Sequence, residues 1–164
     1  MIRMMRRQWW SIRRLRVRAF LLMAGLLLGA AVAQSAEPVS PKLTPKLRDL
    51  LRQEMVSVNQ ASQQILAALV TGDDDHVATL AQQIHDSFIM NQSMTEADEA
   101  ALLAAVPEAF VQQDEAFHEL AAALAGAARA GDRPQQQKHF SQMIEACTAC
   151  HATYATDRFP HFTR

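Results

Sequence analysis

Apolar side chains recur at intervals of three and four residues through much of the chain, and this spacing constrains the fold more than any other feature. Leu47, Leu51, Met55 and Val58 open the pattern. Such spacing places side chains on one face of an α-helix. Ala and Gln are abundant, whereas β-branched and aromatic residues are few outside the first thirty positions, which favours helix over strand. The sequence therefore predicts an all-α protein.

Capping residues, glycines and prolines divide this pattern into four predicted helices. They cover 45–71, 73–89, 95–131 and 132–154. Thr44 and Gly72 bound the first helix. Pro107 should kink or restart the third. Since the connections are only a few residues long, we expect antiparallel neighbours and an up-down-up-down four-helix bundle.

The first 33 residues have the features of a secretory signal peptide. Seven arginines precede an apolar block from Ala19 to Ala33, which ends in the small-residue cleavage pattern Ala31-Val32-Ala33. The block has about fifteen residues, whereas a helix needs roughly 20 to cross a bilayer. We therefore expect export with removal of residues 1–33. Retention of this leader as a membrane anchor is the alternative.

Removal of the leader would change the charge of the protein. It would leave nine Lys and Arg against 17 Asp and Glu, a net charge of about eight negative units. Such a surface repels nucleic acid and anionic lipid, so we expect the mature protein to bind neither. Residues 34–43 hold two prolines and no apolar period, which predicts a flexible N-terminal lead-in. Residues 44–164 should form one four-helix domain.

The chain has two cysteines, Cys147 and Cys150, and His151 follows the second directly. On a helix these positions bring all three side chains to nearly one face. Three interpretations fit poorly. A disulfide within a helix closes only a tiny loop and stabilises little. A thioredoxin-like redox pair needs a βαβ context, and structural zinc needs four ligands.

Cys-x-x-Cys-His is the attachment motif of c-type haem, and the chemistry explains the spacing. Each thiol adds across one haem vinyl group to make a thioether, while the imidazole reaches the iron from one side. We therefore predict one haem c, attached through Cys147 and Cys150, with His151 as an iron ligand. In bacteria this attachment takes place outside the cytoplasm, which agrees with a periplasmic protein. A haem-free helical module with structural thiols is the remaining alternative.

One such motif on the last of four helices, near the C-terminus, resembles the class II cytochromes c, the cytochrome c-prime family and its low-spin relatives. The resemblance covers about Leu43 to Phe159. It is strongest in "CTACHATY", where Tyr154 matches the aromatic residue that the family usually has three positions after the motif histidine. The segment "LRQEM" is similar to the family's Arg-Gln segment. The family often has a basic residue directly after this tyrosine. Here Ala155 follows, and Arg158 is the nearest base.

The ligand opposite His151 determines the function of such a protein. A methionine sulfur gives six-coordinate, low-spin iron suited to electron transfer, whereas an open site gives five-coordinate iron that binds nitric oxide or carbon monoxide. The low-spin members supply their methionine from the first helix, so the resemblance implies Met55. An alignment shifted by one residue would place Val56 there. The resemblance also favours Arg52 as the partner of a haem propionate, and Arg48 could serve instead.

The sequence thus predicts a periplasmic cytochrome that transfers single electrons, with a five-coordinate protein that binds or scavenges small gases as the alternative. We expect no enzymatic activity, because no acid–base catalytic constellation is evident. The negative charge predicts a redox partner with a basic docking surface. The family often forms homodimers, and the alanine-rich outer positions permit one here.

Overall fold

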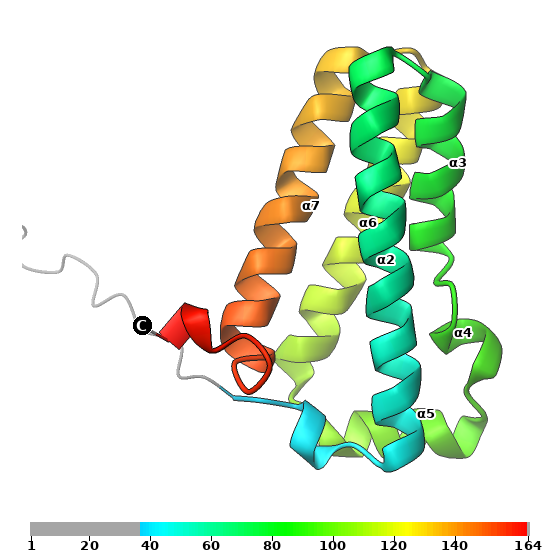
Figure 1. Ribbon diagram of the computed structural model, residues 1–164. Helices are drawn as coiled ribbons and strands as arrows, with labels where there is room; N and C mark the ends of the chain where they lie inside the picture. The colour runs from blue at the N-terminus through cyan, green and yellow to red at the C-terminus, as the bar shows by residue number, and fades with distance from the viewer. Residues whose placement is uncertain (1–36, 164) are drawn as a thin grey trace, which may run out of the picture. The chain divides into compact units, whose positions relative to one another are not determined.

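The computed structural model describes residues 37–163, which contain helices and no strand. In chain order the helices are η1 (Ser40–Lys42), α2 (Pro45–Thr71), α3 (Asp74–His85), α4 (Met90–Ser93), α5 (Glu96–Ala105), α6 (Glu108–Arg129), α7 (Arg133–Tyr154) and η2 (Pro160–Thr163). Helices α2, α3, α6 and α7 pack as an antiparallel bundle, while α4 and α5 lie in the connection between α3 and α6 (Figure 1). The predicted all-α four-helix bundle is confirmed. The proposed signal peptide, 1–33, lies outside the described residues.

Local capping interactions set most of the helix ends. The Thr44 side chain accepts the N–H of Leu47 at 3.3 Å at the start of α2. Gly72 follows the last residue of this helix with φ 74°, a left-handed conformation that glycine adopts without steric cost. Thr95 and Asp98 form a reciprocal capping box at the start of α5. These helix ends lie where the sequence predicts them.

The helix predicted over 73–89 is shorter in the structure, because α3 ends at His85. Ser87 has a left-handed backbone (φ 62°), through which a right-handed helix does not continue. The backbone N–H groups of the next three residues point to the carboxylate of Glu54 on α2. The segment MNQS then forms the separate helix α4.

The helix predicted over 95–131 is divided at Pro107. Helix α5 ends at Ala105, and Pro107 is the N-cap of α6. Proline has no backbone N–H and its ring clashes with the preceding helical turn, so the chain restarts there.

The first described residues belong to the predicted flexible lead-in, 34–43, but they pack on the bundle. Val39 and Leu43 are each 3% exposed. The N–H of Val39 donates to the carbonyl of Tyr154 at 3.0 Å. This carbonyl lies in the last turn of α7, where intrahelical donors are lacking. The lead-in therefore closes the C-terminal end of α7 and adds apolar side chains to the core.

Two apolar clusters fill the bundle. The first core joins α2, α3 and α6 with Met143 of α7. The second core lies where α7 ends and buries Val39, Leu43, Leu47, Val106 and Tyr154, with partly buried residues that include Leu51, Met94, Leu102, Phe110 and Cys150. Because Cys150 packs on the second core, this cluster positions the cysteine–histidine motif.

Candidate haem-binding site

The cysteine–histidine motif lies in the last two turns of α7. Cys147, Cys150 and His151 are all partly buried. Both thiols are free, so no disulfide joins them. Positions three and four apart on a helix share one face, and the structure therefore presents both sulfurs and the imidazole together.

The surroundings of the motif keep these groups uncharged. Burial raises the pKa of the Cys147 thiol. Burial, with a smaller contribution from the charge of Asp114, raises the pKa of Cys150 to about 11. Burial also lowers the pKa of His151, which favours the neutral imidazole. Neutral imidazole is the form that ligates a metal.

Cys150 packs on the second core together with apolar side chains from other helices. Among them are Leu51 of α2, Leu102 of α5 and Phe110 of α6. The Phe110 ring meets Tyr154 edge to face, with centroids 5.3 Å apart. A large apolar macrocycle attached at Cys150 needs such walls to be favourably buried. The free thiols, the neutral imidazole and this apolar cluster together fit a haem attached to α7.

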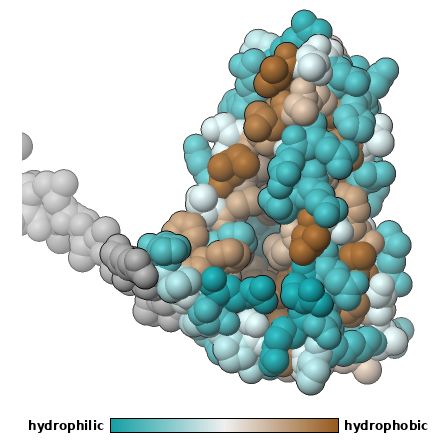
Figure 2. All heavy atoms as spheres, viewed as in Figure 1, coloured by the Kyte–Doolittle hydropathy of each residue, from teal (hydrophilic) through white to brown (hydrophobic). Residues whose placement is uncertain are grey.

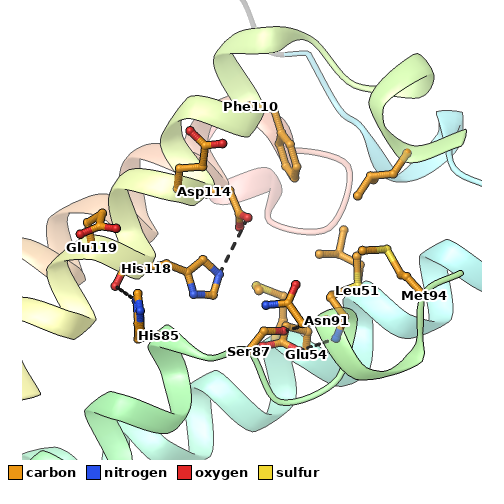
Figure 3. A pocket seen from close by; sticks show the side chains of 14 residues that line it. Leu51, Glu54, His85, Ser87, Asn91, Met94, Phe110, Asp114, His118 and Glu119 are labelled. Atoms are coloured by element: carbon orange, nitrogen blue, oxygen red, sulfur yellow. Dashed lines mark hydrogen bonds and ion pairs between the residues drawn. The ribbon is translucent and has the colours of Figure 1, made fainter. Parts of the chain in front are cut away.

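A partly open cavity of about 300 Å³ lies beside the second core, lined by residues of helices α2 to α6. Leu51, Met94, Leu102 and Phe110 line the cavity and also belong to the cluster that contacts Cys150. Figure 3 shows Leu51, Met94 and Phe110 at one end of the cavity, and polar side chains of α3 and α6 at the other. The cavity therefore borders the cluster that holds the motif.

Helices α2 and α7 leave large apolar side chains uncovered. Met55 is 37% exposed, and Leu66 and Ile144 are about half exposed. Helix α2 packs mainly on α3 and contacts α7 only sparsely. Figure 2 shows hydrophobic residues among hydrophilic ones over both helices. Apolar surface is thus available on the two helices that carry the predicted iron ligands.

The predicted ligand Met55 lies at the edge of the buried face of α2. The buried positions of this helix are Leu47, Glu54, Val58, Ala61, Ile65 and Ala68. Glu54, rather than Met55, therefore occupies the centre of the inward stripe. Met55 nevertheless lines the cavity, whereas Val56 does not and is 49% exposed. Of Met55 and Val56, the two positions that the alignment leaves open for the iron ligand, only Met55 lines the cavity.

The polar partners of the two candidate arginines of α2 lie outside the motif. Arg52 lies on the surface, 3.5 Å from the carboxylate of Asp49. Exposed ion pairs of this kind contribute little to the stability of a protein, so the Arg52 guanidinium can exchange Asp49 for another partner. Arg48 instead donates to the carbonyls of Ser40 and Leu43, each at 3.0 Å. Arg52 is therefore the more available of the two.

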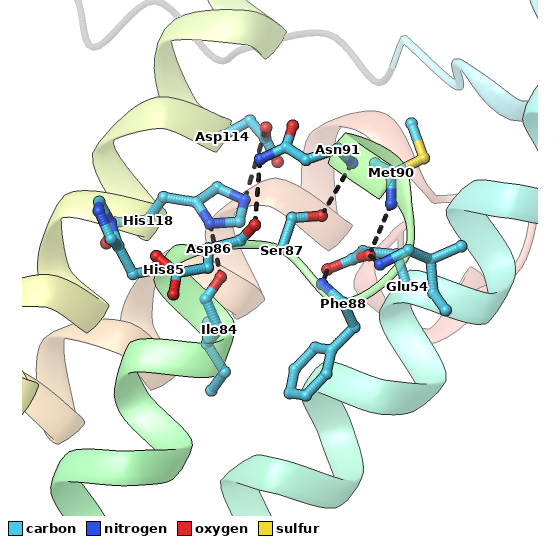
Figure 4. Close-up of polar contacts among 11 residues, drawn as sticks. Glu54, Ile84, His85, Asp86, Ser87, Phe88, Met90, Asn91, Asp114 and His118 are labelled. Carbon is cyan, nitrogen blue, oxygen red and sulfur yellow. Dashed lines mark hydrogen bonds and ion pairs between the residues drawn. The ribbon is translucent and has the colours of Figure 1, made fainter. Parts of the chain in front are cut away.

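Glu54 is a site residue that the sequence interpretation missed. Its carboxylate is buried (2% exposed) and accepts the N–H groups of Phe88, Ile89 and Met90 at 2.9, 2.6 and 3.1 Å (Figure 4). It therefore joins α2 to the junction between α3 and α4 and fixes one wall of the cavity. The sequence contains an indication of this role. The spacing of three and four residues from Leu47 to Val58 includes position 54, so an acid stands on the face of α2 that should be buried.

His118 of α6 and His85 of α3 line the other end of the cavity. The His118 ring bonds the carbonyl of Ile84 at 2.8 Å, and the His85 ring bonds the carbonyl of His118 at 3.1 Å. Asp114 lies 3.8 Å from His118. Burial raises the pKa of Asp114, and the nearby His118 opposes this shift. Among residues 37–163, no three His, Cys, Asp or Glu side chains are placed to hold a metal ion.

A four-helix bundle with free Cys-x-x-Cys-His thiols on its last helix, set in an apolar cluster, has the features of a haem-binding c-type cytochrome. The sequence profile of the Cytochrome C' family matches residues 49–155, and the chain belongs to this family. The family implies haem c as the cofactor, and its members are typically secreted. Comparisons with curated proteins and with solved structures gave no match. Within the described part of the chain, none of the helices has the length and apolar character needed to span a membrane.

Proposed function

We propose that the protein transfers single electrons in the periplasm through one haem c, attached by Cys147 and Cys150 and ligated by His151 and Met55. When bound, the haem supplies an iron that accepts and releases one electron. The two cysteines hold it as thioethers, and His151 offers a neutral imidazole from the same helix face. Arg52 provides a charge-assisted partner for a propionate.

The relation between Met55 and the motif carries the proposal. Leu51, one turn before Met55, belongs to the same apolar cluster as Cys150, the residue before His151. Met55 and Leu51 also line one cavity. A group attached at Cys150 and buried in this cluster would therefore have His151 on one helix and Met55 on another within its surroundings. A histidine and a methionine that both ligated the iron would suit electron transfer.

The absorption spectrum of the holoprotein tests this ligation. Met55→Ala should convert low-spin iron to high spin and remove the far-red sulfur-to-iron band. Val56→Ala, at the neighbouring exposed position, is the matched control and should leave the spectrum unchanged. A low-spin spectrum that persists in Met55→Ala excludes Met55 as the ligand.

The cavity supports a second candidate function, the binding or scavenging of small gases. Its volume of about 300 Å³ beside Met55 is ample for a diatomic molecule. If Met55 is only a wall of this cavity, the iron is five-coordinate. The wild-type ferric protein would then be high spin, and carbon monoxide would shift the ferrous spectrum.

The charge distribution supports a basic redox partner. No lysine or arginine occurs between Arg52 and Arg129, a stretch that includes all of α3, α4 and α5. Attraction between opposite charges accelerates association, and salt screens it. Electron transfer to a basic acceptor protein should therefore slow as ionic strength rises.

The exported protein should begin after Ala33 if the leader is cleaved, and N-terminal sequencing of the exported protein measures this.

A further inference from the structure

The chain turns back onto the motif directly after α7. The N–H of Ala155 donates to the carbonyl of His151 at 3.3 Å. The N–H groups of Arg158 and Phe159 donate to the carbonyl of Ala155 at 3.0 and 2.9 Å. This tight turn places Phe159 beside the last turn of α7.

The Phe159 ring stacks on the imidazole of His151. The ring centroids are 4.6 Å apart and the planes differ by 25°. The nitrogen lone pair and the N–H of an imidazole lie in the plane of the ring, so a ring on its face leaves both nitrogens accessible. Histidines that ligate metals are usually oriented by a hydrogen bond to the second nitrogen. For His151, the described contact that orients the ring is the stack with Phe159.

We infer that Phe159 is a positioning residue that sets the plane of the His151 imidazole and shields one of its faces from water. This inference rests on the proposed function, because it takes His151 as an iron ligand. The stack restricts rotation of the His151 imidazole about its Cβ–Cγ bond. This rotation angle would set the orientation of the imidazole plane relative to a bound haem. Phe159 is 41% exposed, so its outer face remains in solvent while its inner face covers the ligand.

The C-terminal segment offers a matched control. Phe162 lies three residues after Phe159, is 46% exposed, and is not in ring contact with His151. Phe159→Ala removes the stack, Phe159→Tyr retains it, and Phe162→Ala removes an aromatic ring of similar exposure from the same segment.

Proton NMR of the ferric holoprotein reports the imidazole plane, because the hyperfine shifts of the haem methyl groups depend on its orientation. Phe159→Ala should change the pattern of these shifts, while Phe159→Tyr and Phe162→Ala should keep the wild-type pattern. The reduction potential of Phe159→Ala should also fall, since water at the ligand favours the more highly charged ferric state.

A wild-type methyl pattern in Phe159→Ala overturns the inference, and so do equal changes in Phe159→Ala and Phe162→Ala. A pyridine haemochrome assay is made first on each sample. Absence of covalent haem from the wild-type protein refutes the proposed function instead. The stack is then measured in the same samples as a nuclear Overhauser contact between the rings of His151 and Phe159, and absence of that contact refutes the positioning role.

Discussion

Replacement of Glu54 should destabilise the protein more than any surface substitution, because this residue satisfies three backbone donors at once. Glu54 is buried, with 2% of the residue exposed. One oxygen accepts the N–H of Phe88, and the other accepts those of Ile89 and Met90. These donors lie at the break between α3 and α4, where helical carbonyl partners are lacking.

The magnitude follows from the number of bonds lost. A hydrogen bond to a charged group contributes about 1.5–3 kcal/mol, and a buried donor left without an acceptor costs about 1–3 kcal/mol. Glu54→Gln can retain the two bonds to one oxygen but turns its amide NH₂ toward the third N–H, so we expect a loss of about 2 kcal/mol. Glu54→Ala leaves all three donors unsatisfied, and we expect a loss of about 5 kcal/mol. The latter is a large part of the roughly 5–15 kcal/mol that stabilises a typical domain.

Urea unfolding followed by circular dichroism measures both losses. Glu119→Gln, an exposed acid at the same cavity, is the matched control and should change the free energy of unfolding by no more than about 0.5 kcal/mol. If Glu54→Gln and Glu54→Ala both stay within about 0.5 kcal/mol of wild type, Glu54 does not hold the junction between α3 and α4.

Three other predictions concern pH, backbone conformation and thiol reactivity. The pKa of Asp98 is lowered to about 2, mainly by the hydrogen bond from Lys46. Ionised Asp98 therefore stabilises the folded protein at pH values above its unfolded pKa of about 3.9, and this stabilisation is lost as pH falls toward 2. Asp98→Asn should flatten the dependence of the unfolding midpoint on pH in that window. Gly72→Ala should lower the free energy of unfolding by about 1 kcal/mol, because the backbone φ at this position is 74°. Gly126→Ala should raise it by about 0.5–1 kcal/mol, because a Cβ at this position of α6 meets open space. Urea unfolding measures both changes. Since the pKa of Cys150 is about 11, iodoacetamide at pH 8 should alkylate the folded, haem-free protein far more slowly than the urea-unfolded chain, and equal rates would contradict its burial.

The helix borders were largely predictable because their determinants are local. The Thr44 cap bonds a residue three positions later, and the capping box of Thr95 and Asp98 spans the same distance. The end of α3 was not predictable in this way. It depends on Glu54, whose carboxylate reaches a backbone N–H 34 residues further along the chain. A contact of that range leaves only a weak trace in the sequence, the acid at an inward-facing position.

The features of the candidate site also differ in whether local sequence determines them. Cys147, Cys150 and His151 form a local motif, so their shared helix face follows from their spacing alone. The residues that line the cavity come from five helices, α2 to α6, so the cavity requires the packed fold. The stack of Phe159 on His151 depends on the turn after α7, and the spacing of the residues in the sequence does not indicate it.

Intact mass of the mature protein, produced in a host that attaches c-type haem, shows directly whether haem is covalently bound. We predict a mass increase of one haem per chain that persists after denaturation. We also predict that the Cys147→Ser/Cys150→Ser double variant carries no covalent haem. A wild-type mass equal to that of the polypeptide alone would show that Cys147 and Cys150 do not attach haem.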